Sequence, residues 1–515
     1  MSRRLSSSPW VVAALGAAAY LLIAPPSADL AAQEYRADLV RRAGLGIWDN
    51  GWYAGHHTPA YSVLFPPLGA VLGVQLAGAL AAVAAAALFA ALARRHWPAR
   101  PACAAAVWFA LATTATLLTG RMTFLLGVAL GAGALLALGT GRRRAAAAAI
   151  LAAATTLASP VAGLFLALAV LAWGLAAPGR RVGAALVAAA ALGPAVVLAA
   201  LFPEGGSEPF APSAFWPALA AIALVAALLP ARERALRAGA AVYALACVAA
   251  FALATPLGGN VTRLGALVAG PVLLGALAGR RRPALLVALA LPLAYWQLYP
   301  AVRDVARAAG DPSVHASYYA PLLRDLDTRA PGVFRVEIPF TANHWESARV
   351  APHIPLARGW ERQLDRRYGA LFYDGTLNAA TYRAWLDEQA VAYVALPDVA
   401  LDYAARGEAR LIERGPAYLH QVWHDEHWRL FAVRDPAPFV SGRARGPLHP
   451  GTDGFALAAR RAGTALVRIR YSRWWRVTAG RACVRRGPGG MTALRVLGAG
   501  TVRVQARLTG SACRG

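Results

Sequence analysis

Residues 76–93 read L-A-G-A-L-A-A-V-A-A-A-A-L-F-A-A-L-A and are followed directly by Arg94 and Arg95. The run contains no charged side chain, and a helix that crosses the hydrocarbon core of a bilayer needs about 20 predominantly apolar residues. The stretch therefore predicts a membrane-spanning helix that ends at a pair of arginines. Repetition of this pattern along the chain decides the fold class.

The pattern recurs throughout the first 300 residues, and the runs together predict about eleven spans. The first run follows Arg3 and Arg4 as a signal peptide would, but no small-residue cleavage site precedes Pro25, which predicts a retained helix. That first run covers residues 9–24, and the runs besides it and residues 76–93 lie at 102–118, 124–140, 145–158, 160–177, 183–202, 215–230, 238–256, 264–279 and 284–299.

The overall composition agrees with a membrane protein. Of the 515 residues, 58% are hydrophobic and 15% are charged, and the mean hydropathy is +0.45, whereas a soluble domain carries about 25% charged residues. The net charge is +26, and because the chain has no lysine, all 52 basic residues counted are arginines. Many of them form short clusters between apolar runs, so we assign the charge to membrane topology and expect no nucleic-acid partner.

Six arginine clusters fall on alternate connections between successive spans, and hence on one side of the membrane. The positive-inside rule makes that side cytoplasmic. An odd number of spans then places the N-terminus in the cytoplasm and the chain after Pro300 outside the cell membrane. The clusters are Arg3/Arg4, Arg94/Arg95/Arg100, Arg142 to Arg144, Arg180/Arg181, Arg232/Arg234/Arg237 and Arg280 to Arg282.

The first outer loop, residues 25–61, begins with an acidic residue close to the lipid boundary. Asp29 lies a few residues beyond the first span, and residues 30–40 have the spacing of an interfacial amphipathic helix. A partly desolvated carboxylate there could accept a proton from a hydroxyl or hold a divalent cation. The structural alternative is that Asp29 caps the helix opening at Leu30, because Asp is a favoured N-cap residue.

The second half of this loop is rich in aromatic residues. Trp52 and Tyr53, with Trp48 nearby, could stack on a sugar ring or form an aromatic belt at the membrane interface. His56 and His57 could bind a metal or act as bases. Because adjacent residues point in different directions in regular structure, one functional histidine is expected rather than two.

A few arginines depart from the charge rule and lie on the outer side. Arg36 stands in the first outer loop with Arg41 and Arg42, whereas Arg121 and Arg263 each stand alone at the outer edge of an apolar span. That placement suits a guanidinium that binds a phosphate with two hydrogen bonds. The alternative is that each side chain snorkels to the lipid headgroups.

The region after residue 300 reads as two soluble modules. Residues 301–440 predict an α/β domain, with strands at V-F-R-V-E-I-P-F (333–340) and V-A-Y-V-A-L-P (391–397) and a helix at T-Y-R-A-W-L-D-E-Q-A (381–390). Residues 441–515 alternate between apolar and polar positions with Gly-rich turns, which predicts a small antiparallel β-sandwich. Cys483 and Cys513 could form a disulfide there if this region faces an oxidising compartment.

Two polar stretches of the outer region allow a structural and a functional interpretation. The stretch from His344 to Asp365 could cover the site at the outer loops from the side of the outer domain, or it could form a solvated, salt-bridged surface. In H-D-E-H, His424 and His427 are three residues apart, so one helical turn could bring both onto a metal, although no third ligand is evident.

This layout resembles the GT-C superfamily of polytopic membrane glycosyltransferases, which use polyprenyl-phosphate-linked sugars. The features that carry the resemblance are Asp29 with Glu34 next in line, the long first outer loop with interfacial helices, about eleven spans and an outer C-terminal domain. The segments G-R-M-T-F-L-L-G (120–127), G-N-V-T-R-L (259–264) and R-G-W-E-R-Q-L-D (358–365) are also similar to bacterial membrane proteins related to this group.

The resemblance implies transfer of a sugar from a polyprenyl-phosphate donor to an envelope glycan, lipid or protein on the outer face. Asp29 would be the catalytic residue, and because Leu30 follows it, the adjacent pair of carboxylates frequent in the family is absent and metal dependence stays open. The alternatives are a transporter or flippase and a catalytically silent scaffold whose outer domain binds glycan. The implied donor-phosphate ligands are Arg121, Arg263 and Arg36, and the implied substrate contacts are Glu34, Trp52, Tyr53, His56 and His57.

Overall fold

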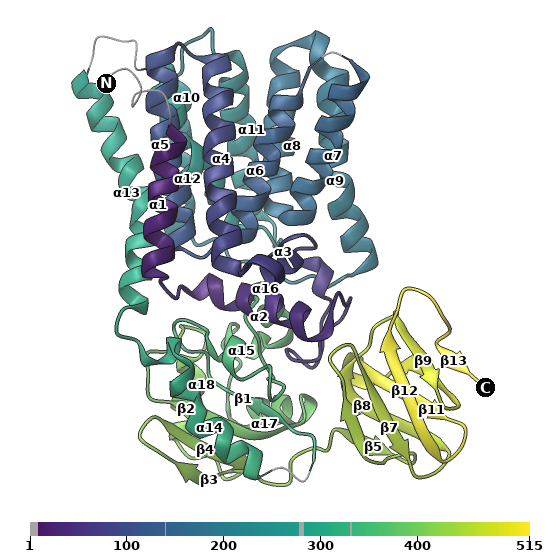
Figure 1. Ribbon diagram of the computed structural model, residues 1–515. Helices are drawn as coiled ribbons and strands as arrows, with labels where there is room; N and C mark the ends of the chain where they lie inside the picture. Colours follow the sequence, from purple (N-terminus) through teal and green to yellow (C-terminus); the bar gives the residue numbers. More distant parts are fainter. Residues whose placement is uncertain (1–8, 140, 278–282, 330–331) are drawn as a thin grey trace. The chain divides into compact units, whose positions relative to one another are not determined.

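The computed structural model describes residues 9–139, 141–277, 283–329 and 332–515 (Figure 1). The chain divides into two compact units, and the division falls inside one helix. The helical unit comprises Met1–Gln33 and Ala60–Ala309, and the C-terminal unit comprises Glu34–Pro59 and Gly310–Gly515. Residues 34–59, which the sequence placed with the membrane domain, are thus grouped with the C-terminal region.

Each of the eleven predicted spans coincides with an α-helix of the helical unit. Five helical stretches are long and apolar enough to cross a membrane, namely those ending at His96, Leu118, Leu201, Ala252 and Leu277. The helices are α1 (Pro9–Ile23), α4 (Val74–His96), α5 (Ala99–Leu118), α6 (Met122–Ala137), α7 (Arg142–Ala158), α8 (Pro160–Ala176), α9 (Arg181–Leu201), α10 (Pro212–Leu228), α11 (Arg234–Ala252), α12 (Thr262–Leu277) and α13 (Pro283–Ala308). The helical unit is therefore a multi-pass membrane domain, and eleven crossings stay a prediction because α6, α8 and α10 are shorter.

Successive connections between the helices lie at alternate ends of the bundle, as the positions of the arginine clusters predict. At one end, Arg95 in the last turn of α4 donates to the carbonyl of Leu136 in α6 at 2.7 Å, and His96 contacts Glu233 before α11 at 2.7 Å. At the other end, Ser62 donates to the carbonyl of Ala158 at the end of α7 at 2.8 Å. The described arginine clusters therefore share one end of the bundle, whereas Arg3/Arg4 and Arg280 to Arg282 lie outside the described residues.

Two further helices lie between α1 and α4: α2 (Ala28–Ala43) is inside the predicted first outer loop, and α3 (Phe65–Leu72) follows that loop. The prolines Pro25 and Pro26 end α1, and α2 leaves it at 79°. The predicted helix is therefore present, but Leu30, Tyr35 and Leu39 are buried in the protein. The apolar side chains that we expected to face lipid instead pack against other parts of the chain.

The α/β part of the C-terminal unit contains a four-stranded sheet of order β1-β2-β4-β3 (Figure 1). Strands β1 and β2 are parallel and the other pairs are antiparallel. The predicted strands and helix are all present. The elements are α14 (Ala316–Thr328), β1 (Arg335–Glu337), α15 (Glu346–Arg349), α16 (Arg362–Tyr368), α17 (Ala379–Glu388), β2 (Val391–Pro397), α18 (Arg406–Glu413), β3 (Leu419–His424) and β4 (Trp428–Val433).

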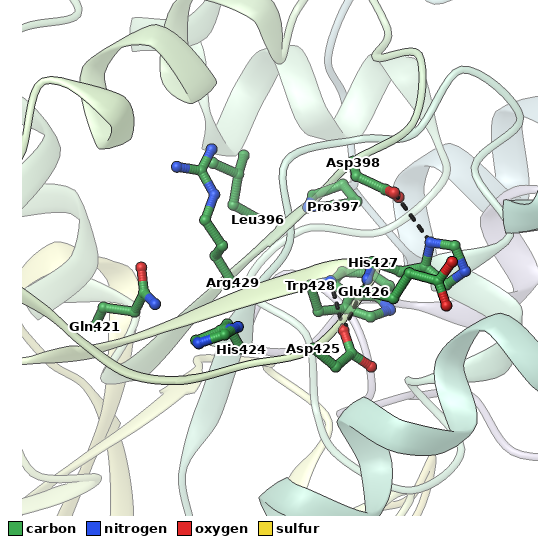
Figure 2. Close-up of a pocket in the computed structure, with 10 residues that line it drawn as sticks. All are labelled: Leu396, Pro397, Asp398, Gln421, His424, Asp425, Glu426, His427, Trp428 and Arg429. Carbon is green, nitrogen blue, oxygen red and sulfur yellow. Dashed lines mark hydrogen bonds and ion pairs between the residues drawn. The ribbon is translucent and has the colours of Figure 1, made fainter.

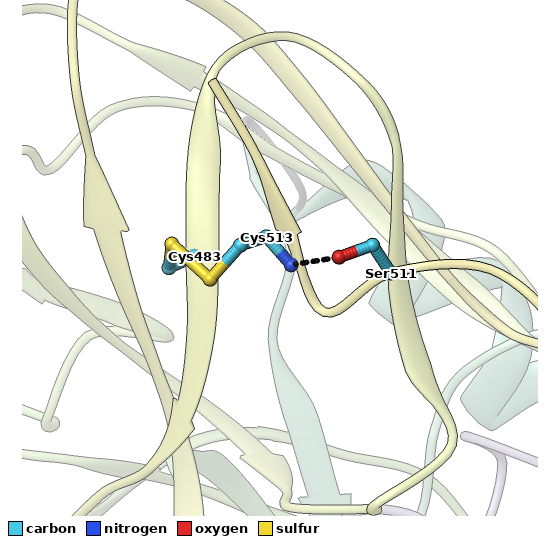
Figure 3. The surroundings of a disulfide bond; sticks show 3 residues. All are labelled: Cys483, Ser511 and Cys513. Atoms are coloured by element: carbon cyan, nitrogen blue, oxygen red, sulfur yellow. Dashed lines mark hydrogen bonds between the residues drawn. A yellow bond between two sulfur atoms is a disulfide. The ribbon is translucent and has the colours of Figure 1, made fainter.

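The last 76 residues or so, from β5 onward, form the predicted β-sandwich. One sheet has the order β13-β10-β11-β8-β5 and the other β6-β7-β12-β9, and Trp475 and Leu494 are buried in its core. Cys483 and Cys513, paired across β10 and β13, form the expected disulfide (Figure 3). The strands are β5 (Val440–Gly442), β6 (Leu448–Pro450), β7 (Gly454–Ala459), β8 (Gly463–Arg470), β9 (Trp475–Ala479), β10 (Ala482–Arg486), β11 (Met491–Val496), β12 (Gly500–Ala506) and β13 (Cys513–Arg514).

Candidate functional site

Three charged side chains meet at one end of the helical unit, and we call them the Asp29 site. The Oδ2 atom of Asp29 lies 3.2 Å from Nε of Arg121 and 4.0 Å from Nη2 of Arg263. The three side chains keep 32%, 29% and 20% of their surface exposed. Two guanidinium groups thus share one carboxylate and stay accessible, which leaves donor capacity for a further anion.

Asp29 takes part in this site because of where α2 begins. The helix starts at Ala28, so Asp29 lies inside its first turn, where a negative charge is favoured by the helix dipole. Within the described residues its carboxylate is directed to the two arginines and makes no N-cap hydrogen bond. The N-cap interpretation is therefore wrong, and the carboxylate is instead paired with the two guanidinium groups.

Gln33, one turn after Asp29, fixes α2 to the turn between α5 and α6. Its amide nitrogen donates to the carbonyl of Gly120, and its amide oxygen accepts from the backbone N–H of Thr123 at 3.1 Å. Gly120 has a φ of 76°, and a Cβ atom there would lie 2.3 Å from Oγ of Ser27. Only glycine allows this approach, which places the neighbouring Arg121 beside the start of α2.

Helix ends surround the site. Arg121 is the N-cap residue of α6, and Arg263 lies in the first turn of α12. The start of α12 is held by Tyr243, whose hydroxyl donates to the carbonyl of Val261 at 2.9 Å and accepts from the N–H of Gly265 at 3.0 Å. The N-termini of α2, α6 and α12 therefore converge, and their dipoles add positive potential.

One donor of the Asp29 site is unsatisfied. The Nε atom of Arg263 is buried and has no hydrogen-bond partner in the described part of the chain, and its guanidinium lies 6.0 Å from the ring centroid of Phe124. Tyr61 and Glu208 lie within electrostatic range of the same guanidinium. Because a buried N–H without a partner is costly, this donor favours a ligand that accepts hydrogen bonds.

The aromatic residues of the first outer loop lie inside the C-terminal unit. Trp52 is 0% exposed; its ring stacks on Tyr35 at 4.2 Å, and its indole donates to the carbonyl of Ser347 at 3.1 Å. Tyr53 donates to the carbonyl of Gly359, and burial raises the pKa of Tyr53 well above its usual value. Neither ring offers a free face, so the structure gives both a packing role rather than the predicted sugar contact or interface belt.

The two predicted histidines are also buried. Nδ1 of His56 lies 3.7 Å from Oδ2 of Asp49, which accepts a hydrogen bond from Tyr35 at 2.9 Å. Nε2 of His57 lies 2.9 Å from Oγ of Ser472. The two side chains point to different partners, as expected for neighbours, but both positions are structural.

Glu34 and Arg36 are separated from the Asp29 site by further turns of α2. Arg36 is buried; it pairs with Glu361 at 2.6 Å and lies 5.2 Å from the ring centroid of Trp52. Glu34 is half-buried, and this burial raises its pKa. Because the side chain of Arg36 is only 5% exposed, whereas those of Arg121 and Arg263 keep 29% and 20%, we do not assign Arg36 to the donor phosphate.

The stretch from His344 to Asp365 is a buried network and not the solvated surface that we weighed. Arg358 is 2% exposed, pairs with Asp365 at 2.7 Å and Glu408 at 3.1 Å, and lies between the rings of Phe340 and Phe372. Its third acidic neighbour, Glu337 at 3.9 Å, is fully buried. The cluster is enclosed by the protein and offers no open site.

The H-D-E-H segment forms a hairpin end and not a helix. His424 ends β3, and Nδ1 of His427 lies 3.0 Å from Oδ2 of Asp398, a hydrogen bond that raises the pKa of His427. Figure 2 shows these side chains around a cavity of about 370 Å³. The described residues contain no group of three His, Cys, Asp or Glu side chains that could hold a metal, so the predicted pair gains no third ligand.

Comparisons with known proteins give a likeness to solved structures but none to a family model or a curated protein. No family model matches the sequence, and no curated protein matches it. Among solved structures, the chain is similar to the "Crystal Structure of ArnT from Cupriavidus metallidurans bound to Undecaprenyl phosphate". The TM-score is 0.45 and the identity 13%, and the match covers 84% of this chain and 99% of that one. At these values the functional assignment has to come from the geometry of the site.

Proposed function

We propose that this chain is a GT-C-like membrane glycosyltransferase that moves a sugar from a polyprenyl-phosphate donor to an envelope acceptor on the outer face. The observation that carries this assignment is the convergence of Asp29, Arg121 and Arg263 at three helix N-termini. The two guanidinium groups supply hydrogen bonds and charge for a phosphate, and the carboxylate between them supplies a proton acceptor. The apolar helices around the site suit a lipid-linked donor.

In the proposed reaction, the acceptor's hydroxyl oxygen attacks the anomeric carbon of the donor and forms the new glycosidic bond. The bond between that carbon and the phosphate oxygen breaks, and the phosphate leaves with the electron pair. Arg121 and Arg263 donate hydrogen bonds to the phosphate as its charge develops. Asp29 accepts the proton of the attacking hydroxyl.

The residues of the site do not fit a divalent cation. Asp29 is the one carboxylate of the Asp29 site, and both guanidinium groups lie within 4.0 Å of it. A cation at the same oxygen would be repelled by these two positive charges. Divalent cations of this kind also need several oxygen ligands, and the site has a single carboxylate. No step of the reaction is therefore assigned to a metal.

The arginines provide the test. In the purified protein, reconstituted with a polyprenyl-phosphate-linked sugar, Arg121→Gln and Arg263→Gln should each lower kcat/KM for the donor by about 10- to 100-fold, because a hydrogen bond to a charged group contributes about 1.5–3 kcal/mol. Arg42→Gln, which removes an exposed arginine paired with Asp38 on the same α2 helix, is the matched control. Transfer by the two site variants at the control's rate would overturn the assignment.

A further inference from the structure

A groove of about 340 Å³ lies between α10 and α11 in the helical unit. It is independent of the Asp29 site and of the reaction proposed there. Six of its nine lining residues are alanines, and one is charged. The lining consists of Leu219, Ile222, Ala223, Ala226 and Ala227 from α10 and Arg237, Ala240, Ala241 and Ala244 from α11.

The groove follows from the spacing of small residues along the two helices. The lining positions recur every three or four residues in both, so each helix contributes one face. Where neighbouring membrane helices normally fill their interface with side chains, alanine methyl groups leave space between α10 and α11. Apart from Arg237 the lining side chains are apolar, and Ile222 and Ala223 form part of the wall.

The direction and length of the groove match one leaflet of a bilayer. Arg237 lies in the first turn of α11, and Ala227 lies at the end of α10, so both mark the arginine-cluster end. From Ala227 back to Leu219, eight residues at 1.5 Å each span about 12 Å. Half of a hydrocarbon core of about 30 Å is about 15 Å, so the groove extends from headgroup depth towards the bilayer centre.

Arg237 supplies charge complementarity at the mouth of the groove. Its side chain is exposed and has no ion-pair partner in the described ranges, because the nearby carboxylate of Glu233 pairs with His96 at 2.7 Å. A basic side chain beside an apolar groove between membrane helices is typical of a site for a lipid phosphate.

We propose that this groove binds an anionic phospholipid, with one acyl chain between α10 and α11 and the headgroup phosphate on Arg237. The chain would bury apolar surface against the alanine faces, at about 0.8 kcal/mol per methylene group. The guanidinium would select an anionic headgroup over a zwitterionic one. The lipid would thereby fill the gap in the helix packing.

Native mass spectrometry of the purified protein, exchanged into micelles with equal amounts of phosphatidylglycerol and phosphatidylcholine, tests this site. The wild type should retain phosphatidylglycerol preferentially. Arg237→Gln should lower that preference about fivefold, as expected for one arginine near a lipid surface. Arg232→Gln, an exposed residue of the same cluster outside the groove, should leave it unchanged.

Filling the groove gives a second, independent readout. Ala223→Leu places a larger side chain in the groove and should abolish retention of the lipid, whereas Ala220→Leu, an exposed position of α10 outside the groove, should preserve it. The proposal would be overturned if both leucine variants retained phosphatidylglycerol equally, or if both arginine variants showed the same preference for it over phosphatidylcholine. Selective retention of a polyprenyl lipid or of a second copy of the chain would also overturn it, and none of these outcomes bears on sugar transfer.

Discussion

Gln33→Leu should loosen the Asp29 site by breaking the attachment of α2 to the α5–α6 turn. The Gln33 side chain is 2% exposed and satisfies two backbone groups, the carbonyl of Gly120 and the N–H of Thr123. Leucine has a similar size and keeps the packing, but leaves both groups without a partner. Because an unsatisfied buried group costs about 1–3 kcal/mol, the expected destabilisation is about 2–6 kcal/mol.

Thermal unfolding in detergent, followed by tryptophan fluorescence, measures this effect. For a chain of this size, each kcal/mol lowers Tm by roughly 2 °C, so Gln33→Leu should lower it by about 4–12 °C. Gln75→Leu on α4 is the control, since this half-buried glutamine makes no hydrogen bond between described residues. Donor turnover should fall at least tenfold in the first variant, because Arg121 adjoins the released turn. An unchanged Tm for Gln33→Leu would refute the reasoning.

Three further predictions concern the C-terminal unit. Burial and the neighbouring carboxylates raise the folded-state pKa of Glu337 and Glu408. Their protonated forms therefore stabilise the fold below the unfolded pKa near 4.5, and this stability is lost as the pH rises through the folded-state pKa values. Glu337→Gln should reduce this loss of stability in melting curves recorded from pH 4.5 to 8. Trp48→Ala should cost about 3–5 kcal/mol, because this buried loop residue packs on Trp475 at 5.0 Å; denaturant unfolding measures it, and a change below 1 kcal/mol would contradict it. Replacing Cys483 and Cys513 by alanine should cost about 2–4 kcal/mol, since their disulfide spans 30 residues; equal stability of the variant and the oxidised protein would exclude that contribution.

The helices and strands could be predicted because their patterns are local. An apolar run of sufficient length determines a membrane helix wherever it packs, and alternation within M-T-A-L-R-V-L determines β11. The disulfide could also be predicted, because Cys483 and Cys513 both lie in strand-like sequence of the same region. Asp29, Arg121 and Arg263 were predicted singly from their positions, and the structure brings all three together.

The rest could not be predicted because it depends on contacts between distant segments. Trp48 and Trp52 have the composition of an interface belt, and only the packing of residues 34–59 in the C-terminal unit shows that they are buried. Arg358 stands in a stretch whose alternating charges indicate a surface, yet it is surrounded by Asp365 of the same stretch and by Glu337 and Glu408 of two other segments. Gln33 was missed because a single amide in a helix carries no signal until its partners at Gly120 and Thr123 are known.

Sugar transfer by Asp29→Asn protein tests the central claim most directly. With a polyprenyl-phosphate-linked sugar as donor, kcat should fall by about 10²- to 10⁴-fold, the contribution of a positioned general base. Donor affinity should be unchanged or tighter, because Arg121 and Arg263 lose the carboxylate that competes with phosphate. The control Asp38→Asn, a half-buried position of the same helix that pairs with Arg41 and Arg42, should transfer normally. Equal kcat for Asp29→Asn and Asp38→Asn would contradict the assignment of the reaction to this site.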